Sequence, residues 1–259
     1  MKKCYLMLGV IIMLVIGCSS MKKLFRAEVS GLVKDPSFSY QAVVKEKMAV
    51  GGVVSLVSQL NNSQRNNYAN VLRAHFVDER KTFQVAPVFS VIKALGQEEY
   101  SQMLSDYKDS GGIDDIWLNK LSGKIKARYV IFTSIQSDDI ENTREKEKED
   151  KYEDNKDKKK DKKKKKVFSR SIRSVSATMN IYDLQQKYIV WSGTVTQKKT
   201  RETEYEEQKD DAIIGIIKAA TKTQTSDDDL YLYPQPPRSN EVVAMVFRGF
   251  AENMPEQKD

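Results

Sequence analysis

Apolar residues occur along the chain in short runs, and their spacing alternates between that of strands and that of helices. Met48–Val57 is an apolar run of strand length with two adjacent glycines, and it is typical of a buried strand. Asn61 begins a group of helix-capping side chains, and apolar residues then recur every three or four positions through Phe76, which predicts an amphipathic helix. The elements predicted next are a strand over 81–86, short helices between 88 and 126, and a strand over 127–135.

A strict alternation of apolar and polar residues predicts a β-hairpin in the second half of the chain. The apolar members of its first strand are Val175, Ala177, Met179 and Ile181. Residues 183–187 are the expected turn, and residues 188–196 are the antiparallel partner strand. The compact apolar segment 212–220 predicts a further helix, although its length also allows a strand. A last helix begins at Ser239 or Asn240. These elements predict an α/β fold with a single mixed β-sheet and helices packed on it.

The N-terminus has the organisation of a secretory signal peptide. Two lysines precede Tyr5–Ile16, an uncharged run that is too short to span about 30 Å of hydrocarbon as a helix. The run ends in Val-Ile-Gly-Cys at Cys18, which resembles the lipobox of bacterial lipoproteins. The resemblance implies that residues 1–17 are removed and that Cys18 carries acyl chains such as palmitate. Residues 18–38 have weak periodicity and mixed polarity, so we expect them to form a flexible tether. The alternatives are an ordinary cleaved signal peptide and an uncleaved anchor.

Charge is concentrated in one segment of the expected domain, which spans residues 39–254. The chain has a net charge of +7, and Glu141–Lys166 contributes +4 of it, with thirteen basic and nine acidic residues. We expect the charged insert at 138–167 to be disordered, because it lacks the apolar residues needed to fold. Because the basicity belongs to this insert, the pI of about 9.1 does not indicate nucleic-acid binding.

The lysine run at the end of the insert is a candidate for contact with anionic lipid headgroups or wall polymers. A solvated spacer and the recognition of a protein partner are the alternatives. The candidate residues are Lys162, Lys163, Lys164, Lys165 and Lys166.

The residue types that catalysis or cofactor binding would need are sparse. The chain has one histidine, His75, which lies on the predicted helix among apolar residues and is expected to be structural. The glycine pairs are not followed by the Gly-Lys-Ser/Thr of a phosphate loop, and the acidic run Asp227–Asp229 lacks the other ligands of a calcium loop. We therefore predict no catalytic, cofactor or metal site. The aromatic residues of the hairpin are candidate interface residues: Trp191, Tyr188 and Tyr182.

The order of these segments resembles a group of envelope proteins. The strand Ala-Arg-Tyr-Val-Ile at 127–131 and the hairpin segments Ile-Tyr-Asp-Leu at 181–184 and Ile-Val-Trp-Ser-Gly at 189–193 carry the resemblance. It covers residues 48–195 and points to the group that includes the penicillin-binding-protein activator lipoprotein LpoB, the N-terminal domain of TolB and the curli secretion channel CsgG. Gln-Gln-Lys at 185–187 replaces the Thr-Gly that is usual in the hairpin turn of the group.

The resemblance implies a lipid-anchored protein of the bacterial outer membrane, on its periplasmic face, that acts as a non-enzymatic interaction or assembly module. Ser19 follows the lipobox cysteine where an aspartate would favour the inner membrane. The implied partner is another envelope protein, as for a wall-synthase activator. An oligomeric ring or secretion component built on the same domain is the alternative. An envelope hydrolase is a third hypothesis, for which no nucleophile and base can be named.

Overall fold

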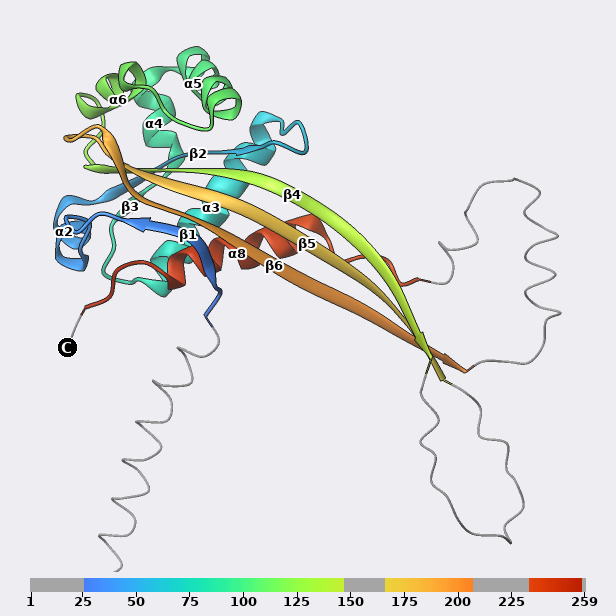
Figure 1. Cartoon of the computed structure of the whole chain (residues 1–259). Helices are drawn as coiled ribbons and strands as arrows, with labels where there is room; N and C mark the ends of the chain where they lie inside the picture. The colour runs from blue at the N-terminus through green and yellow to red at the C-terminus, as the bar shows by residue number, and fades with distance from the viewer. Residues whose placement is uncertain (1–25, 147–165, 207–232, 258–259) are drawn as a thin grey trace, which may run out of the picture. The chain divides into compact units, whose positions relative to one another are not determined.

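The fold is built on one six-stranded mixed sheet, and the computed structural model describes residues 26–146, 166–206 and 233–257. The strand order is β1-β6-β5-β4-β2-β3 (Figure 1). The elements are β1 (Val29–Lys34), α2 (Tyr40–Glu46), β2 (Met48–Ser55), α3 (Asn62–Glu79), β3 (Val85–Ala86), α4 (Val88–Leu95), α5 (Gln97–Ser110), α6 (Asp115–Ser122), β4 (Tyr129–Lys146), β5 (Lys166–Asp183), β6 (Tyr188–Glu206) and α8 (Ser239–Glu252). This confirms the predicted α/β fold.

The chain divides into two compact units. The first unit contains Met1–Ser137, Val175–Gln197 and Val243–Asp259, and the second contains Asp138–Ser174 and Lys198–Val242. Strands β4, β5 and β6 contribute residues to both units. The single domain predicted over residues 39–254 is therefore divided in two.

The core of the first unit is centred on β2 and β4. Every residue of β2 is buried, and the strand runs parallel to β3 on one side and β4 on the other, with Met48 opposite both Val85 and Tyr129. A parallel strand that is covered on both faces needs apolar residues at successive positions. This explains the continuous apolar runs from which both central strands were predicted.

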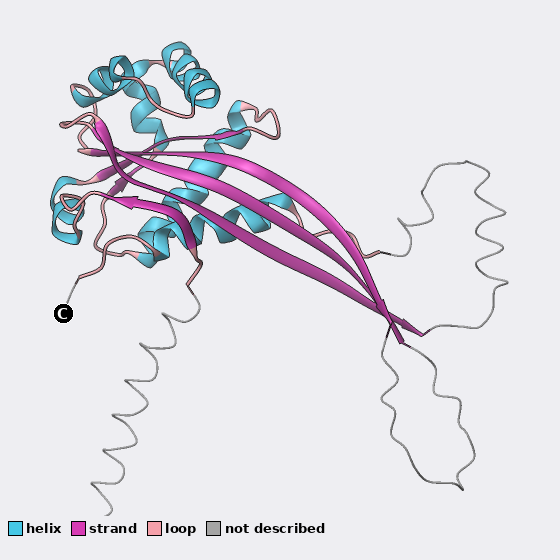
Figure 2. Cartoon of the chain, in the orientation of Figure 1, coloured by secondary structure: helices cyan, strands magenta, loops and turns pink. Residues whose placement is uncertain are grey.

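Helices of the first unit cover both faces of its sheet (Figure 2). On one face, the ring centroid of Tyr107 in α5 lies 5.3 Å from that of Phe132 in β4. On the other face, Phe250 of α8 packs edge-on against Trp191 of β6, with the ring centroids 6.2 Å apart. Aromatic pairs prefer such tilted and edge-to-face arrangements. Helix α3 lies beside α8 on this second face (Figure 2).

The start of α3 has the capping interactions that its sequence predicts. The Asn61 side chain accepts a hydrogen bond from the Gln64 backbone N–H at 2.9 Å, and the Gln64 side chain accepts one from the Asn61 N–H at 2.9 Å. This reciprocal capping box satisfies two backbone donors that the first helical turn leaves free.

The predicted hairpin is formed by β5 and β6. The apolar residues of its first strand are all fully buried: Val175, Ala177, Met179 and Ile181. At the turn, the buried Asp183 carboxylate accepts hydrogen bonds from Arg128 Nε at 2.8 Å and from the Gln185 backbone N–H at 2.8 Å. Arg128 Nη2 lies 2.7 Å from the same carboxylate. The turn is therefore anchored to the residue just before β4.

The prediction that residues 18–38 form a flexible tether is wrong over Val29–Lys34. These residues form β1, which pairs antiparallel with β6, with Val29 opposite Val195 and Lys34 opposite Trp191. Most of the side chains of β1 are exposed, so the segment has no alternation of apolar and polar positions. Its pairing partner is also remote in the sequence, which local patterns do not reveal.

The prediction of a disordered insert over 138–167 is wrong at both of its ends, because β4 continues to Lys146 and β5 begins at Lys166. Opposite charges on neighbouring strands replace apolar packing here. Arg170 of β5 contacts Glu145 of β4 at 2.8 Å and also pairs with Glu202 of β6. Strands stabilised in this way have a charged sequence that is otherwise typical of disorder.

Several predicted segments lie outside the described residues. They are the signal peptide at 1–17, Cys18, the centre of the charged insert and the helix at 212–220. In the part of the chain that the structure does describe, every helix is too short or too polar to cross a bilayer.

Candidate functional site

Two of the three predicted interface residues belong to the core. Trp191 is fully buried, and Tyr182 is 3% exposed. The Tyr182 hydroxyl accepts a hydrogen bond from the Ile113 backbone N–H at 3.0 Å, and burial raises the pKa of this phenol. The interface prediction is therefore wrong for Trp191 and Tyr182, because helices cover the faces of the sheet on which they lie.

The third residue, Tyr188, is 41% exposed at the start of β6. Its hydroxyl donates a hydrogen bond to Asp35 Oδ2 at 3.3 Å, just after the end of β1. The Asp35 backbone N–H in turn donates to the Val190 carbonyl at 2.8 Å. These contacts fix the ring of Tyr188 beside the edge of the sheet, where it is accessible to a partner.

Further exposed apolar side chains belong to β1 and to the start of β6, the strand with which β1 pairs. Leu32 and Val33 of β1 are 50% and 60% exposed, and Ile189 follows Tyr188 in β6 with 37% exposure. We call the group formed by Leu32, Val33, Tyr188 and Ile189 the edge surface. A binding surface built on apolar and aromatic side chains is typical of protein partners.

The free edge of the sheet belongs to β1 and not to the hairpin. In the strand order of the described residues, β1 is terminal and β6 lies between β1 and β5 (Figure 1). A register shift occurs between Ser30 and Val33, where Gly31 has a φ of 61°. Such bulges are common on edge strands, where they limit uncontrolled pairing with other chains. The hairpin of β5 and β6 therefore does not form this edge of the described sheet.

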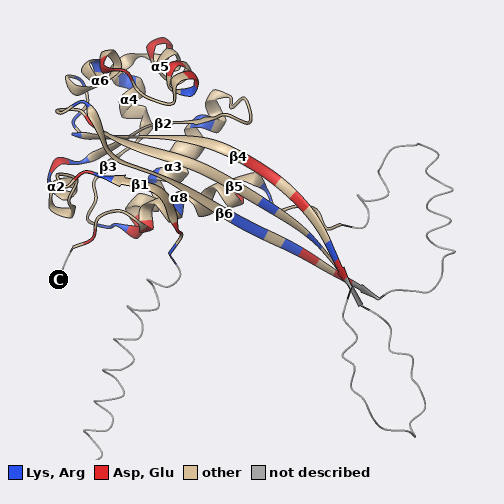
Figure 3. Ribbon diagram, viewed as in Figure 1, with Lys and Arg blue, Asp and Glu red and all other residues tan. Residues whose placement is uncertain are grey.

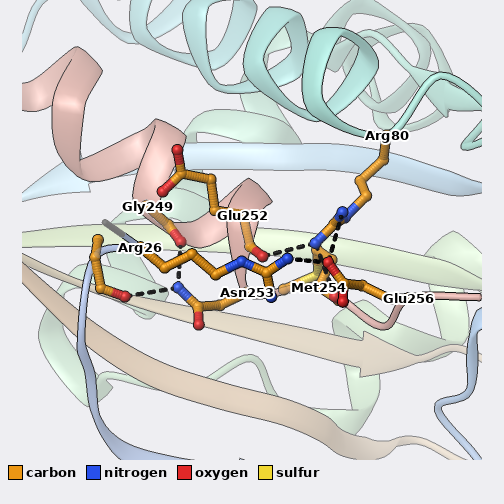
Figure 4. A network of polar contacts seen from close by, with 8 residues as sticks. Arg26, Arg80, Gly249, Glu252, Asn253, Met254 and Glu256 are labelled. Carbon is orange, nitrogen blue, oxygen red and sulfur yellow. Dashed lines mark hydrogen bonds and ion pairs between the residues drawn. The ribbon is translucent and has the colours of Figure 1, made fainter. Parts of the chain in front are cut away.

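A network of charged residues holds the segment before β1 against the C-terminal end of the chain (Figure 4). Arg26 pairs with Glu256, and Arg80 Nη1 lies 3.3 Å from the same carboxylate. Arg80 also donates to the Glu252 carbonyl at 2.6 Å, and the Asn253 side chain donates to the Ala27 carbonyl at 2.8 Å. The network therefore joins α3, the end of α8 and the first described residues.

This network borders a cleft of about 620 Å³. Burial alone would raise the pKa of Glu256, but the pairs with Arg26 and Arg80 hold this pKa below its usual range. Arg248, which also lines the cleft, pairs with Glu79 at 3.0 Å. The basic and acidic groups of the cleft neutralise one another, so the arrangement is that of a structural clasp.

His75 lies on α3 near the same cluster of charges. Burial lowers its pKa, and the positive charge of Arg248 lowers it further. The residue is half-buried, and its lowered pKa favours the neutral imidazole. Among the residues that the structure describes, no three His, Cys, Asp or Glu side chains are grouped so that they could hold a metal ion.

The predicted anionic-surface lysines are not tested by the structure. Lys162 to Lys165 lie outside the described residues, and Lys166 is the first residue of β5. The described part of the second unit shows a different distribution of charge. The outer parts of β4 and β6 each contain both acidic and basic residues (Figure 3).

Comparison with known proteins gives structural neighbours but no family. No family model and no curated protein matches the chain. The lipoprotein GNA1162 from Neisseria meningitidis has 15% identity and a TM-score of 0.34, over 68% of this chain and 94% of that chain. The PelC dodecamer from Paraburkholderia phytofirmans has 14% identity and a TM-score of 0.31, over 67% of this chain and 82% of that chain.

The C-terminal domain of LpoB from Salmonella enterica is also similar, with 15% identity and a TM-score of 0.30, over 62% of this chain and 96% of that chain. LpoB belongs to the group that the sequence resembles.

Proposed function

We propose that this chain is a lipoprotein of the bacterial outer membrane that binds another envelope protein on the periplasmic side and has no catalytic activity of its own. Acyl chains on Cys18 anchor it in the bilayer, and the edge surface contacts the partner. Leu32 and Val33 of the edge surface belong to the first described strand, a short distance along the chain from Cys18, and this position is the observation that carries the proposal. An anchored interaction module needs a lipid anchor and a partner-binding surface on the same chain.

The exposed edge of β1 suits the recognition of an extended segment of a partner. An added strand forms backbone hydrogen bonds with the free edge, and neighbouring side chains provide specificity. Leu32 and Val33 offer apolar contacts on the strand itself, while Tyr188 offers a ring with a fixed hydroxyl. Tyrosine is enriched among the residues that dominate binding energy at interfaces.

The length of the tether limits where the partner can lie. Fourteen residues separate Cys18 from Leu32. Even a fully extended chain of this length reaches at most about 50 Å. The edge surface therefore works close to the membrane, and the partner must present its binding segment within that distance of the lipid surface.

Capture of partners by the full chain tests the interface. The chain is purified from membranes in detergent and used to capture proteins from envelope extracts, in parallel with the variants Tyr188→Ala and Ile189→Asp. Both variants should lose a partner that the unchanged chain captures reproducibly. Ile116→Asp is the matched control, because Ile116 is an exposed apolar residue of α6, 67% accessible, and it does not belong to the edge surface. Equal capture by all four chains would contradict the proposal.

Lipid attachment has a separate test. Metabolic labelling with a fatty acid should label the unchanged chain, and Cys18→Ala should remove both the label and the sedimentation with outer-membrane fractions. A labelled Cys18→Ala chain, or an unlabelled wild-type chain in the soluble fraction, would contradict the anchoring at Cys18.

A further inference from the structure

A cleft lined by basic side chains lies in the first unit, at the end of the sheet where β2 and β4 begin (Figure 1). Its walls come from the end of α2, the segment between α6 and β4, and the turn between β5 and β6. Its volume of about 330 Å³ is at the lower end of the range that is typical of small-ligand sites. We call it the basic cleft, and the charged side chains that line it are those of Lys45, Glu46, Lys47, Lys126 and Arg128.

Two carboxylates compensate part of this positive charge. Arg128 is bound to the buried Asp183 through Nε at 2.8 Å and Nη2 at 2.7 Å. Glu46 lies 3.7 Å from Lys45 Nζ, and its negative charge adds to the hydrogen bond from Asp183 in raising the pKa of Arg128. Four basic groups less two acidic groups leave the basic cleft with an excess of two positive charges.

The excess corresponds to Lys47 and Lys126. Both residues are exposed, and neither takes part in an ion pair within the described ranges of the chain. An ammonium group is a compact charge with three hydrogen-bond donors, and lysine is a common ligand of phosphate oxygens. The basic cleft therefore offers two free cationic groups to an anion.

Lys47 also has a backbone conformation that strongly favours glycine. Its φ of 61° and ψ of 160° lie in a region that residues with a side chain rarely adopt. The Arg128 N–H donates to the Glu46 carbonyl at 3.1 Å, and the Tyr129 N–H donates to the Lys47 carbonyl at 3.3 Å, so the start of β4 holds this conformation in place. Such strain is concentrated at ligand-binding sites, where a particular side chain is needed. A lysine where glycine would fit without strain thus indicates that its ammonium group has a role.

We propose that the basic cleft binds a phosphate monoester, whose oxygens accept hydrogen bonds from the ammonium groups of Lys47 and Lys126. A phosphate monoester carries nearly two negative charges at neutral pH, which balances the excess of two positive charges. A carboxylate or a phosphate diester carries one negative charge and would leave one lysine uncompensated. A small soluble ester and the headgroup of a lipid both present this chemistry.

Calorimetric titration of the full chain in a non-ionic detergent tests the proposal, with glycerol 3-phosphate as the probe. The wild-type chain should bind one equivalent, at least about tenfold more tightly than it binds the diester dimethyl phosphate at the same ionic strength. Lys47→Ala and Lys126→Ala should each weaken the binding by about tenfold. Lys93→Ala is the matched control, because Lys93 is an exposed lysine of α4 that does not line the basic cleft, and it should bind as the wild-type chain does.

Lys47→Gly separates a binding role from a structural one. A lysine near the end of a helix can also stabilise that helix, but this role does not require a strained residue. Lys47→Gly should unfold at a higher urea concentration than the wild-type chain, because the strain is removed, and should bind glycerol 3-phosphate about tenfold more weakly. The higher stability would show that the weaker binding does not result from misfolding. Unchanged binding by Lys47→Gly, no saturable binding by the wild-type chain, or equal binding of the monoester and the diester would overturn the proposal.

A short-chain lipid distinguishes the two sources of the ester. Dihexanoyl phosphatidic acid is titrated into the wild-type chain and into Lys47→Ala, and the difference between the two chains removes the contribution of the detergent micelle. A larger difference than with glycerol 3-phosphate identifies a lipid headgroup, and an equal or smaller one identifies a soluble ester; either result supports the phosphate site.

This inference uses no residue of the edge surface. Tyr188→Ala should lose the envelope partner and still bind glycerol 3-phosphate, whereas Lys47→Ala should capture the partner. Failure of either proposal is therefore visible while the other holds.

Discussion

Gly51 in the centre of β2 provides a direct test of the packing that we describe for the first unit. A Cβ atom at this position would lie 2.4, 2.6 and 2.7 Å from three ring carbons of Phe132. Favourable contacts between carbon atoms occur at about 3.5–4.0 Å, so the added methyl group overlaps the ring by more than about 1 Å. The ring cannot retreat, because Phe132 is fully buried and packs against Tyr107 and Tyr182.

We expect Gly51→Ala to lower the free energy of unfolding by about 2–3 kcal/mol. Overpacking of a core costs about 1–3 kcal/mol, and this site lies at the upper end because the overlap is with a fixed ring. The lower conformational entropy of the unfolded alanine chain offsets roughly 0.4–1 kcal/mol of that cost. Urea unfolding followed by tryptophan fluorescence measures the change, since Trp117 and Trp191 are both buried in the first unit.

Gly123→Ala is the matched control. Gly123 has a φ of −85°, which alanine adopts readily, and a Cβ there would meet no atom within 4 Å. The unfolding free energy of Gly123→Ala should be equal to that of the wild-type chain or slightly higher. Phe132→Leu introduced together with Gly51→Ala should cost less than the sum of the two single changes, because the smaller side chain relieves the overlap. A wild-type stability for Gly51→Ala, or strict additivity with Phe132→Leu, would refute this account of the core.

Three further predictions concern the hairpin turn and α3, and equilibrium unfolding measures each of them. Asp183→Ala should lower the unfolding free energy by about 3 kcal/mol, because it leaves the largely buried Arg128 guanidinium unpaired; a loss below about 1 kcal/mol would contradict the role of this pair. Lys187 has a φ of 62°, a left-handed conformation that strains a residue with a side chain, so Lys187→Gly should raise the unfolding free energy by up to about 1 kcal/mol. A lower unfolding free energy would contradict this strain. His75 has a pKa below its usual 6.5 because it is buried, so the unfolded chain binds the proton more readily than the folded chain. The free energy of unfolding of the wild-type chain should therefore fall as the pH is lowered from about 8 to about 5, and it should fall less in His75→Gln. Equal pH dependence in the two chains would contradict this assignment.

The part of the fold that local sequence patterns predict is the part that buries apolar residues. Strands β2 and β4 were predicted because positions covered on both faces must be apolar in succession, as at Val130 and Ile131. The β5 strand was predicted because one of its faces is buried and the other is polar. Asn61 identified the start of α3 because capping depends only on neighbouring residues.

The parts that were missed are held by remote partners or by charge. Strand β1 pairs with a segment more than 150 residues away, and its exposed side chains show no period. The outer halves of β4, β5 and β6 are joined through pairs such as Arg173 with Asp138, whose composition locally equals that of a disordered segment. Composition alone does not distinguish opposite charges that face each other in a sheet from opposite charges on an unfolded chain.

The same limitation explains the outcome for the candidate site. Alternation identifies the two faces of a strand but not which helix will cover one of them. Trp191 is covered by α8, which follows β6 only after a long connection, so its exposure could not be judged from the hairpin alone. Tyr188 is the first residue of β6 and is 41% exposed.

Recruitment of β1 as the edge strand also determines how the N-terminal segment is joined to the first unit. The charged network at Arg26 and Glu256 is partly exposed, and ion pairs in that setting contribute at most about 1 kcal/mol each. The backbone ladder between β1 and β6 extends over more residues than this charged network does. It continues through the hydrogen bond from the Asp35 N–H to the Val190 carbonyl. The ladder is thus the stronger attachment of the N-terminal segment to the first unit. Under the proposed function, a partner strand added to the free side of β1 would form a second ladder there, so β1 would be held by backbone hydrogen bonds on both sides.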